Sequence, residues 1–262
     1  MHPALWISKT GLDAQQTNVS VISNNLANAS TVGYKKSRAV FEDLLYQTIN
    51  QPGGRSSQNT TMPSGLMIGV GAKVVATQKD HQQGNVQTTD NAFDLMINGR
   101  GFFEILMPDG NIAYTRNGQF SLNEDGTIVT PGFGYPLQPE IQVPEDAQSF
   151  TVGEDGEVSV QVAGQAASQV IGQITITDFV NPAGLEPVGQ NLYLETGSSG
   201  APQQGIAAEN GLGGIHQGAL ETSNVNVTEE LVNLIEAQRV YEMNSKVIST
   251  VDQMLNFATQ QL

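Results

Sequence analysis

An apolar residue recurs every seven positions along the C-terminal part of the chain. The series consists of Val227, Leu234, Tyr241, Ile248 and Leu255. A period of seven keeps the row on one side of a helix that winds around a partner, so it favours a left-handed coiled coil over an isolated helix. Asn226, with Glu229 three residues later, is typical of a helix N-terminus. The sequence therefore predicts a helix over about 226–260.

The N-terminal part carries a row with the same period. It consists of Leu5, Leu12, Val19 and Leu26, and Pro3 suits a first helical turn. A helix over about 3–28 is predicted. Polar residues such as Gln238 and Ser245 interrupt the C-terminal stripe. The seam between the two helices is therefore incomplete in one chain, and other chains can complete it. The alternative is an ordinary amphipathic pair packed on its own domain.

The middle of the chain has the pattern of β-strands. Apolar alternation or apolar runs occur at 72–77, 102–106 and 170–176. Five dipeptides that favour tight hairpins lie among them: Asn98-Gly99, Asp109-Gly110, Asn117-Gly118, Asp125-Gly126 and Asp155-Gly156. The predicted fold class is α+β, with long terminal helices that pair as a coiled coil and a central, mainly antiparallel β body.

Three regions follow from these patterns. Residues 1–30 plus 226–262 form a discontinuous coiled-coil domain. Residues 31–94 plus 213–225 form a connecting β or extended domain. Its segment 47–65, rich in Gly, Ser, Asn and Thr, is expected to be an extended or mobile polar loop. Residues 95–212 form an outer β domain.

Charge and composition exclude several classes of protein. The 262 residues carry a net charge of −15, which argues against nucleic-acid binding because phosphate contacts need clustered Lys and Arg. The chain has no cysteine, which excludes disulfides. No apolar run is long enough to span a membrane. The N-terminus lacks the pattern of a signal peptide, so export would need another route.

Motifs for catalysis or ligand binding are missing from the sequence. His2, His81 and His216 are widely separated and have no other metal-ligand pattern around them. The acidic turns do not complete a calcium loop, and there is no phosphate loop or nucleophile elbow. The sequence therefore predicts no catalytic residue, no cofactor and no metal, and a protein that is not an enzyme.

Three blocks of sequence resemble the bacterial flagellar rod and hook family of axial proteins. They are NNLANASTVGYKKS near the N-terminus, DLMINGRGFFEI followed by YTRNGQFSLNEDGTIVTPGFGYPL in the middle, and GALETSNVNVTEELVNLIEAQRVYEMNSKVISTVDQML near the C-terminus. The resemblance is specific over 18–38, 91–137 and 218–256. It is weaker between about 140 and 212.

The resemblance implies a structural subunit that polymerises with itself into a hollow helical tube. It implies other rod proteins, the hook protein, the surrounding P and L rings and the flagellar type III export apparatus as partners. It also implies a location in the basal body, in the rod that crosses the periplasm and peptidoglycan. Chain length and the C-terminal block favour the distal rod. A proximal rod subunit is the alternative, and a secreted β-rich binding module is a weaker one.

The assembly interface is expected on the terminal helices and on the motif that follows the first of them. It comprises the two heptad rows given above together with Asn24, Asn25, Asn28, Gly33, Tyr34 and Lys35. The motif is interpreted as a helix end and an intersubunit surface at once. Substitution of Asn25 or Gly33 is therefore expected to impair assembly more than folding.

Overall fold

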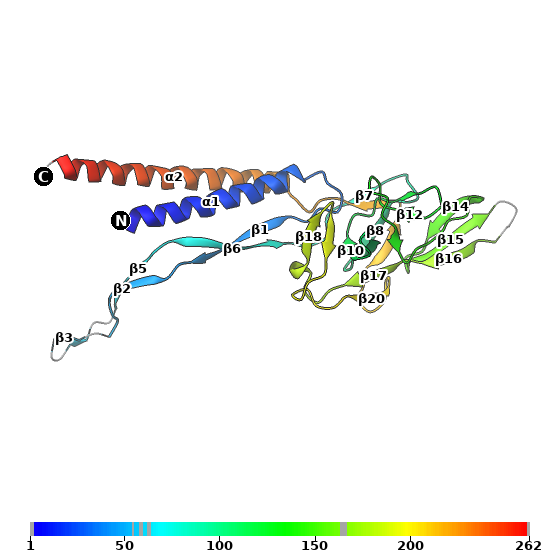
Figure 1. Ribbon diagram of the computed structural model, residues 1–262, viewed down its shortest axis with the longest axis horizontal. Helices are drawn as coiled ribbons and strands as arrows, with labels where there is room; N and C mark the ends of the chain where they lie inside the picture. Colours follow the sequence, from blue (N-terminus) through cyan, green and yellow to red (C-terminus); the bar gives the residue numbers. More distant parts are fainter. Residues whose placement is uncertain (1–2, 54, 58–59, 62–63, 163–166, 261–262) are drawn as a thin grey trace. The chain divides into compact units, whose positions relative to one another are not determined.

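The computed structural model describes residues 3–53, 55–57, 60–61, 64–162 and 167–260 (Figure 1). These residues fall into two compact units. Unit 1 takes its residues from 1–27, 37–79 and 226–262, and unit 2 takes them from 28–36 and 80–225. The sequence predicted three regions. The segment 37–79, part of the predicted connecting domain, lies in unit 1 and contacts the first helix.

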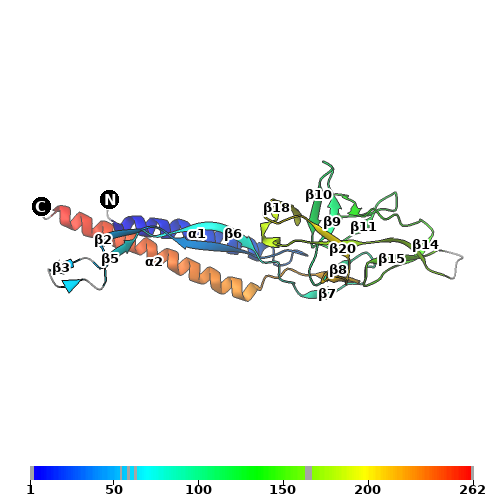
Figure 2. The same ribbon diagram turned by 90° about the horizontal axis from the view of Figure 1, so that it is seen from below.

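Unit 1 contains two helices, α1 (Pro3–Ala27) and α2 (Val227–Gln260). They contact each other and run side by side in both views (Figures 1 and 2). The Asn226 side-chain oxygen accepts hydrogen bonds from the backbone N–H groups of Thr228 at 3.1 Å and Glu229 at 3.5 Å, as a helix cap does. Two terminal helices around a strand-rich middle confirm the α+β prediction.

The rest of unit 1 is one long antiparallel hairpin built from nested strand pairs. Its strands are β1 (Ser37–Asp43), β2 (Tyr46–Asn50), β3 (Arg55–Ser57), β4 (Thr60–Thr61), β5 (Leu66–Gly69) and β6 (Ala72–Lys79). β1 pairs with β6, β2 with β5 and β3 with β4. The range 47–65, predicted as a loop, therefore carries strand pairing, although 54, 58–59 and 62–63 lie outside the described residues.

Unit 2 consists of short antiparallel strands. They are β7 (Val86–Thr88), β8 (Leu95–Asn98), β9 (Phe103–Leu106), β10 (Ile112–Thr115), β11 (Ser121–Leu122), β12 (Ile128–Val129), β13 (Leu137–Gln138), β14 (Ala147–Val152), β15 (Glu157–Val162), β16 (Gln169–Gln173), β17 (Thr175–Asp178), β18 (Glu186–Gly189), β19 (Leu192–Leu194), β20 (Gln203–Ile206), β21 (Gly214–Gln217) and β22 (Ala219–Glu221). A short 3₁₀ helix, Pro182–Gly184, precedes β18.

The largest sheet of unit 2 has the strand order β13-β9-β10-β19-β18. A second sheet has the order β14-β15-β16, and the remaining strands form the pairs β11-β12, β17-β20, β8-β21 and β7-β22. The last two pairs join strands from the start and the end of the unit. The last two strands before α2, β21 and β22, therefore lie beside β8 and β7, the first strands of the unit.

Three of the five predicted turns join hairpins. Gly110, Gly126 and Gly156 adopt positive φ between β9 and β10, β11 and β12, and β14 and β15. The prediction is wrong for Asn98-Gly99, because β8 pairs with β21 and not with the next strand. It is also wrong at Asn117-Gly118. A Cβ on Gly118 would meet the carbonyl oxygen of Leu95, so this glycine serves a close approach of two backbones.

The core of unit 2 is apolar and largely closed to solvent. Phe103, Ile105, Val158, Ile174 and Ile176 are fully buried in one cluster. A second cluster gathers Phe102, Tyr114, Phe179, Leu185 and Tyr193. Each large side chain removed from water contributes about 1.5–3 kcal/mol to folding. Unit 2 therefore contains a complete hydrophobic core of its own.

Candidate functional site: the terminal helices and the motif after the first

Small and polar side chains form the buried seam where α1 and α2 face each other. A Cβ on Gly11 would lie 3.1 Å from the side-chain nitrogen of Asn244, so glycine allows a close approach of the helices. The buried positions of the two helices are Ser8, Ala14, Ile22 and Asn25 on α1 and Glu230, Ala237 and Val251 on α2. Ile22 and Val251 are the largest apolar members of this set, so the most buried positions of the two helices are mainly small or polar.

The two predicted heptad rows lie beside this seam and are not its most buried part. Leu5, Leu12, Val19 and Leu26 are half-buried, as are Leu234 and Ile248. Val227, Tyr241 and Leu255 are exposed, with 45%, 44% and 41% of their surface accessible. The tightest row of α2 runs three residues later, through Glu230, Ala237 and Val251, again with a spacing of seven or twice seven.

Large apolar side chains of unit 1 lie on its surface. On the helices they are Trp6, Ile7, Val227, Leu231, Val232, Ile235, Tyr241, Met243, Val247, Met254, Leu255 and Phe257. On the hairpin they are Val40, Phe41, Leu45, Tyr46, Ile49, Leu66, Met67, Ile68 and Val75. Single exposed apolar residues are ordinary, but so many in one unit are typical of a surface that contacts other molecules.

Asn25 of the motif ties three elements of unit 1 together. Its amide nitrogen donates to the carbonyl of Ser37, and its oxygen accepts from the N–H of Ser37, both at 2.8 Å. The same nitrogen lies 3.4 Å from Oε2 of Glu230. Asn25 is only 2% exposed. This side chain therefore joins the end of α1 to the starts of β1 and α2, whereas the neighbouring Asn24 is an exposed residue.

Gly33 occupies a position that requires glycine. Its φ is +70°, and a Cβ would lie 2.8 Å from backbone atoms of Arg116 and Asn117. Its N–H donates to the carbonyl of Glu221 at 2.8 Å. Tyr34 beside it is 7% exposed, and Asn28 is half-buried. Gly33 and Tyr34 therefore pack inside unit 2.

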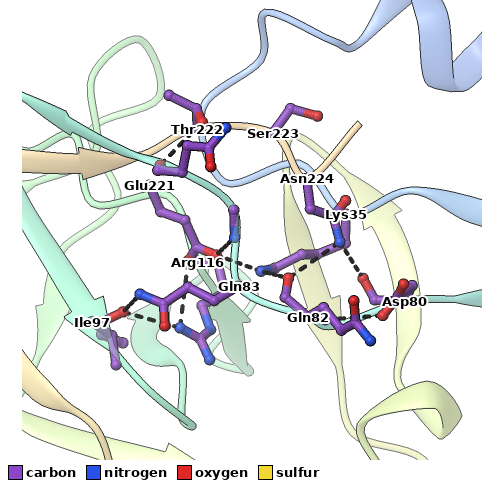
Figure 3. A network of polar contacts seen from close by, with 12 residues as sticks. Lys35, Asp80, Gln82, Gln83, Ile97, Arg116, Glu221, Thr222, Ser223 and Asn224 are labelled. Atoms are coloured by element: carbon purple, nitrogen blue, oxygen red, sulfur yellow. Dashed lines mark hydrogen bonds and ion pairs between the residues drawn. The ribbon is translucent and has the colours of Figure 1, made fainter. Parts of the chain in front are cut away.

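Lys35 belongs to a buried cluster of charges (Figure 3). Its ammonium lies 2.5 Å from Glu221, whose other carboxylate oxygen lies 3.4 Å from Arg116. The Lys35 ammonium also donates to the carbonyl of Gln82 at 2.7 Å. Lys35 is fully buried, Glu221 is 2% exposed and Arg116 is 6% exposed. Two cations thus share one carboxylate away from water.

Burial and pairing act on this cluster in opposite directions. Burial lowers the pKa of Lys35, and the Glu221 carboxylate beside it raises that pKa. Burial likewise lowers the pKa of Arg116, and the Glu221 carboxylate raises it. The Arg116 guanidinium also donates to the carbonyls of Gly99 at 2.6 Å and Ile97 at 3.3 Å. These bonds hold the cluster in one geometry and fix Lys35 within unit 2.

Asn224 completes the arrangement. Its side-chain oxygen accepts from the N–H of Lys36 at 2.7 Å, and its amide donates to the carbonyls of Asp80 at 2.9 Å and Gln82 at 3.2 Å. The N–H of Asp80 in turn donates to the carbonyl of Lys36 at 2.9 Å. Hydrogen bonds therefore join the three segments 33–36, 80–84 and 221–224, which we call the clasp.

The roles of Glu221, Asn224 and Arg116 were not found from the sequence. Glu221 and Asn224 lie in the C-terminal block that carries the family resemblance, but nothing in the spacing links them to Lys35 or Arg116. Among the described residues, no group of three or more His, Asp or Glu is arranged to hold a metal ion. None of the described helices is long and apolar enough to cross a membrane.

Family models match three parts of the chain. Residues 6–35 match the flagella basal body rod protein, residues 96–160 the D1 domain of the flagellar hook protein FlgE/F/G, and residues 216–261 the C-terminal part of the flagellar basal body rod FlgEFG protein. The first match covers most of α1 and the motif up to Lys35, the last covers α2, and the middle one falls in unit 2.

The chain is also similar to rod proteins over nearly its whole length. It is 55% identical to the flagellar basal-body rod protein FlgG of Buchnera aphidicola subsp. Acyrthosiphon pisum, covering 99% of this chain and 100% of the relative. Proteins of the same name from Borreliella burgdorferi and Bacillus subtilis are 46% and 40% identical, covering 98% and 97% of both chains. Such identity over the full length shows that the chain belongs to the family of the flagellar basal-body rod protein FlgG.

Proposed function

We propose that this chain is a structural subunit of the distal rod, which polymerises into a hollow helical shaft. The shaft transmits torque from the motor to the hook, and its channel allows export. The observation that carries the proposal is the set of large apolar side chains that α1, α2 and the hairpin leave on the surface of unit 1. The names of the relatives support the rod as the place of assembly.

Polymerisation gives these side chains a partner. Burial of apolar surface contributes about 25 cal/mol per Å². Within the subunit, α1 and α2 meet through small and polar residues, so their larger side chains remain available to helices of neighbouring copies. The heptad rows, with Tyr241 and Leu255 exposed and Leu234 half-buried, fit coiled-coil packing between subunits.

Asn25, Gly33 and Lys35 enter the proposal through the fold of the subunit. Each is buried within its own unit, so its side chain or backbone is engaged inside one chain. We propose that these residues prepare the subunit for assembly, while the exposed apolar residues make the contact itself. The sequence led us to expect that Asn25 and Gly33 substitutions impair assembly more than folding, and with this division we propose instead that they act on assembly through the fold.

The remaining partners follow from family membership. We propose that the rod meets the other rod proteins, the hook protein and the P and L rings, and that the chain reaches its site through the flagellar type III export apparatus. The full-length similarity to proteins named FlgG favours the distal rod over a proximal position. A secreted binding module is not supported by these relatives.

Charge insertion on α2 tests the proposal. Leu255→Asp places a carboxylate on the exposed apolar face, where burial in a polymer would be costly. Gln253→Asp adds the same charge at an exposed polar position two residues away. Sedimentation and electron microscopy of the purified proteins should show filaments for wild type and Gln253→Asp but not for Leu255→Asp. Circular dichroism should show all three folded. Normal filaments from Leu255→Asp would contradict this assignment of the interface.

A further inference from the structure

Unit 2 contains a cavity of about 650 Å³ with an aromatic floor. The rings of Phe93 and Phe150 lie with their centroids 4.8 Å apart and their planes tilted by 32°. The walls come from the end of β11 at Leu122, from the turn after it, which includes Glu124, and from the segment that leads into β14, which includes Glu145. Two stretches distant in the sequence therefore form one recess.

Hydrogen bonds hold the floor and walls in place. The amide nitrogen of Gln217 donates to the carbonyls of Ala92 at 2.8 Å and Phe150 at 2.9 Å, next to the two floor rings. Its oxygen accepts from the N–H of Val152 at 3.2 Å. The two walls are joined by the N–H of Val143, which donates to the carbonyl of Gly126 at 2.8 Å. The recess is thus built into the fold before any ligand arrives.

The rim of the recess is negative. The Glu124 and Glu145 side chains line it and are exposed, and each is followed in the sequence by an exposed aspartate, Asp125 or Asp146. Neither glutamate has a side-chain hydrogen bond or ion pair to another described residue. Of the described residues that line the recess, none is a lysine or an arginine. The carboxylates therefore remain unneutralised over an aromatic surface.

This combination selects a particular side chain. A cation is attracted to the face of an aromatic ring, and the aliphatic stem of Arg or Lys covers apolar surface while its head meets carboxylates. An anionic group would be repelled by both features, and a purely apolar group would gain nothing from the carboxylates. Arginine fits best, because its planar head both stacks on rings and pairs with carboxylates.

We propose that this recess docks a basic segment of another protein, with an Arg or Lys side chain inserted over Phe93 and Phe150 between Glu124 and Glu145. Charge complementarity supports the choice, since the whole chain has a net charge of −15. A second copy is a poorer occupant. A second copy carries the same excess of negative charge, and of the four cations in its most basic stretch, residues 1–40, Lys35 is buried and Lys36 faces Asp80 at 3.9 Å, which leaves Lys9 and Arg38 exposed. The inference is independent of the proposed polymer contact.

A peptide titration of the full chain tests the inference. The probe is the peptide acetyl-Gly-Arg-Leu-Arg-Gly-amide, with acetyl-Gly-Glu-Leu-Glu-Gly-amide as its acidic counterpart. NMR should show shifts at 122–126 and 143–150 with the arginine peptide alone. Glu124→Gln combined with Glu145→Gln should raise its Kd about tenfold, because two charge pairs are lost. Glu186→Gln, an exposed carboxylate elsewhere in unit 2, should leave the Kd unchanged.

Three results of the peptide titration would overturn the proposal. One is equal binding of the acidic peptide, and another is an unchanged Kd in the double variant. The third is absence of shifts at millimolar peptide. Sedimentation supplies a separate comparison, since self-association that only the double variant loses would identify a second copy as the occupant and refute the basic partner. A double variant that sediments as the wild type while losing peptide affinity supports it.

Discussion

Unit 2 encloses most of its large apolar side chains, whereas unit 1 leaves many of its own exposed. In unit 2, Phe103, Ile105 and Ile174 have no accessible surface. In unit 1, the buried apolar residues among those described are Ala14, Ile22, Ala39, Ala237 and Val251. Larger residues of this unit, such as Leu231, Ile235 and Phe257, expose 43%, 50% and 64% of their surface.

The difference separates two uses of apolar surface. Unit 2 uses it for the stability of the single chain. Unit 1 joins its helices through small and polar side chains and keeps its larger apolar residues available for contact with other molecules. Since the same residue types have opposite surroundings in the two units, matched substitutions can test the distinction directly.

The largest expected effect is a truncation in the core of unit 2. Phe103→Ala should lower the free energy of unfolding by about 3–5 kcal/mol, because it leaves a cavity. Leu255→Ala in unit 1 should change it by less than about 0.5 kcal/mol in the monomer. Urea unfolding followed by circular dichroism measures both. Similar losses for the two variants would break the distinction between the units.

Removal of the buried carboxylate should come next. Glu221→Gln leaves Lys35 and Arg116 buried without their counter-charge, and breaking a buried pair costs about 3–5 kcal/mol. Glu209→Gln, at an exposed position of the same unit, is the control. Thermal unfolding should show a marked loss of stability for the first variant only. Equal stability of both would show that the charge cluster does not stabilise unit 2.

A smaller loss is expected from Gly33→Ala. The substitution combines positive φ with a clash against the backbone of Arg116, and such strain costs on the order of 1–3 kcal/mol. Gly110→Ala has positive φ as well, but nothing lies within 4 Å of its Cβ. The difference in unfolding free energy between the two variants, measured in urea, therefore reports the clash of the added Cβ with the backbone of Arg116. No difference would place Gly33 outside the packed interior.

The smallest effect concerns alkaline pH. Burial, with Glu104 and Glu195 nearby, raises the pKa of Tyr114 from 10.0 to about 12. The folded chain keeps this proton where the unfolded chain loses it, so the stabilising contribution is present below pH 10 and is lost as the pH rises through 12. Tyr114→Phe should make the fall in unfolding free energy between pH 10 and 12 shallower. Tyr241→Phe, on exposed α2, is the control, and parallel curves for wild type and Tyr114→Phe would contradict the shift.

The sequence predicted the helices well because their signals are local. Asn226 caps α2 as expected, and both helices begin and end within one residue of the predicted limits. Three Asp-Gly turns were also located correctly, since positive φ at glycine is a property of a few neighbouring residues. The strands of the long hairpin were less visible, because its polar residues have the composition of a loop.

The arrangement of the candidate site depended on distant contacts. The apolar rows suggested the seam, but close packing favours small residues, and the seam runs through Ala237 with Gly11 facing Asn244. The clasp joins Lys35 to Glu221, 186 residues away in the sequence. The sequence around Lys35 does not identify Glu221 as its partner. Lys35 was therefore expected on an intersubunit surface, whereas it is buried within unit 2.

The clasp also bears on how the two ends of the chain find each other. Asn25 and Glu230 are 205 positions apart, and closing a flexible loop of that length has an entropic cost. The clasp gathers Lys36, Asp80 and Asn224, which lie next to three of the points where the chain passes from one unit to the other. Once unit 2 has folded, the starts of β1 and α2 and the end of β6 are already neighbours along short tethers. Folding of unit 2 thus shortens the effective chain length between α1 and α2, which lowers the entropic cost of pairing the two helices.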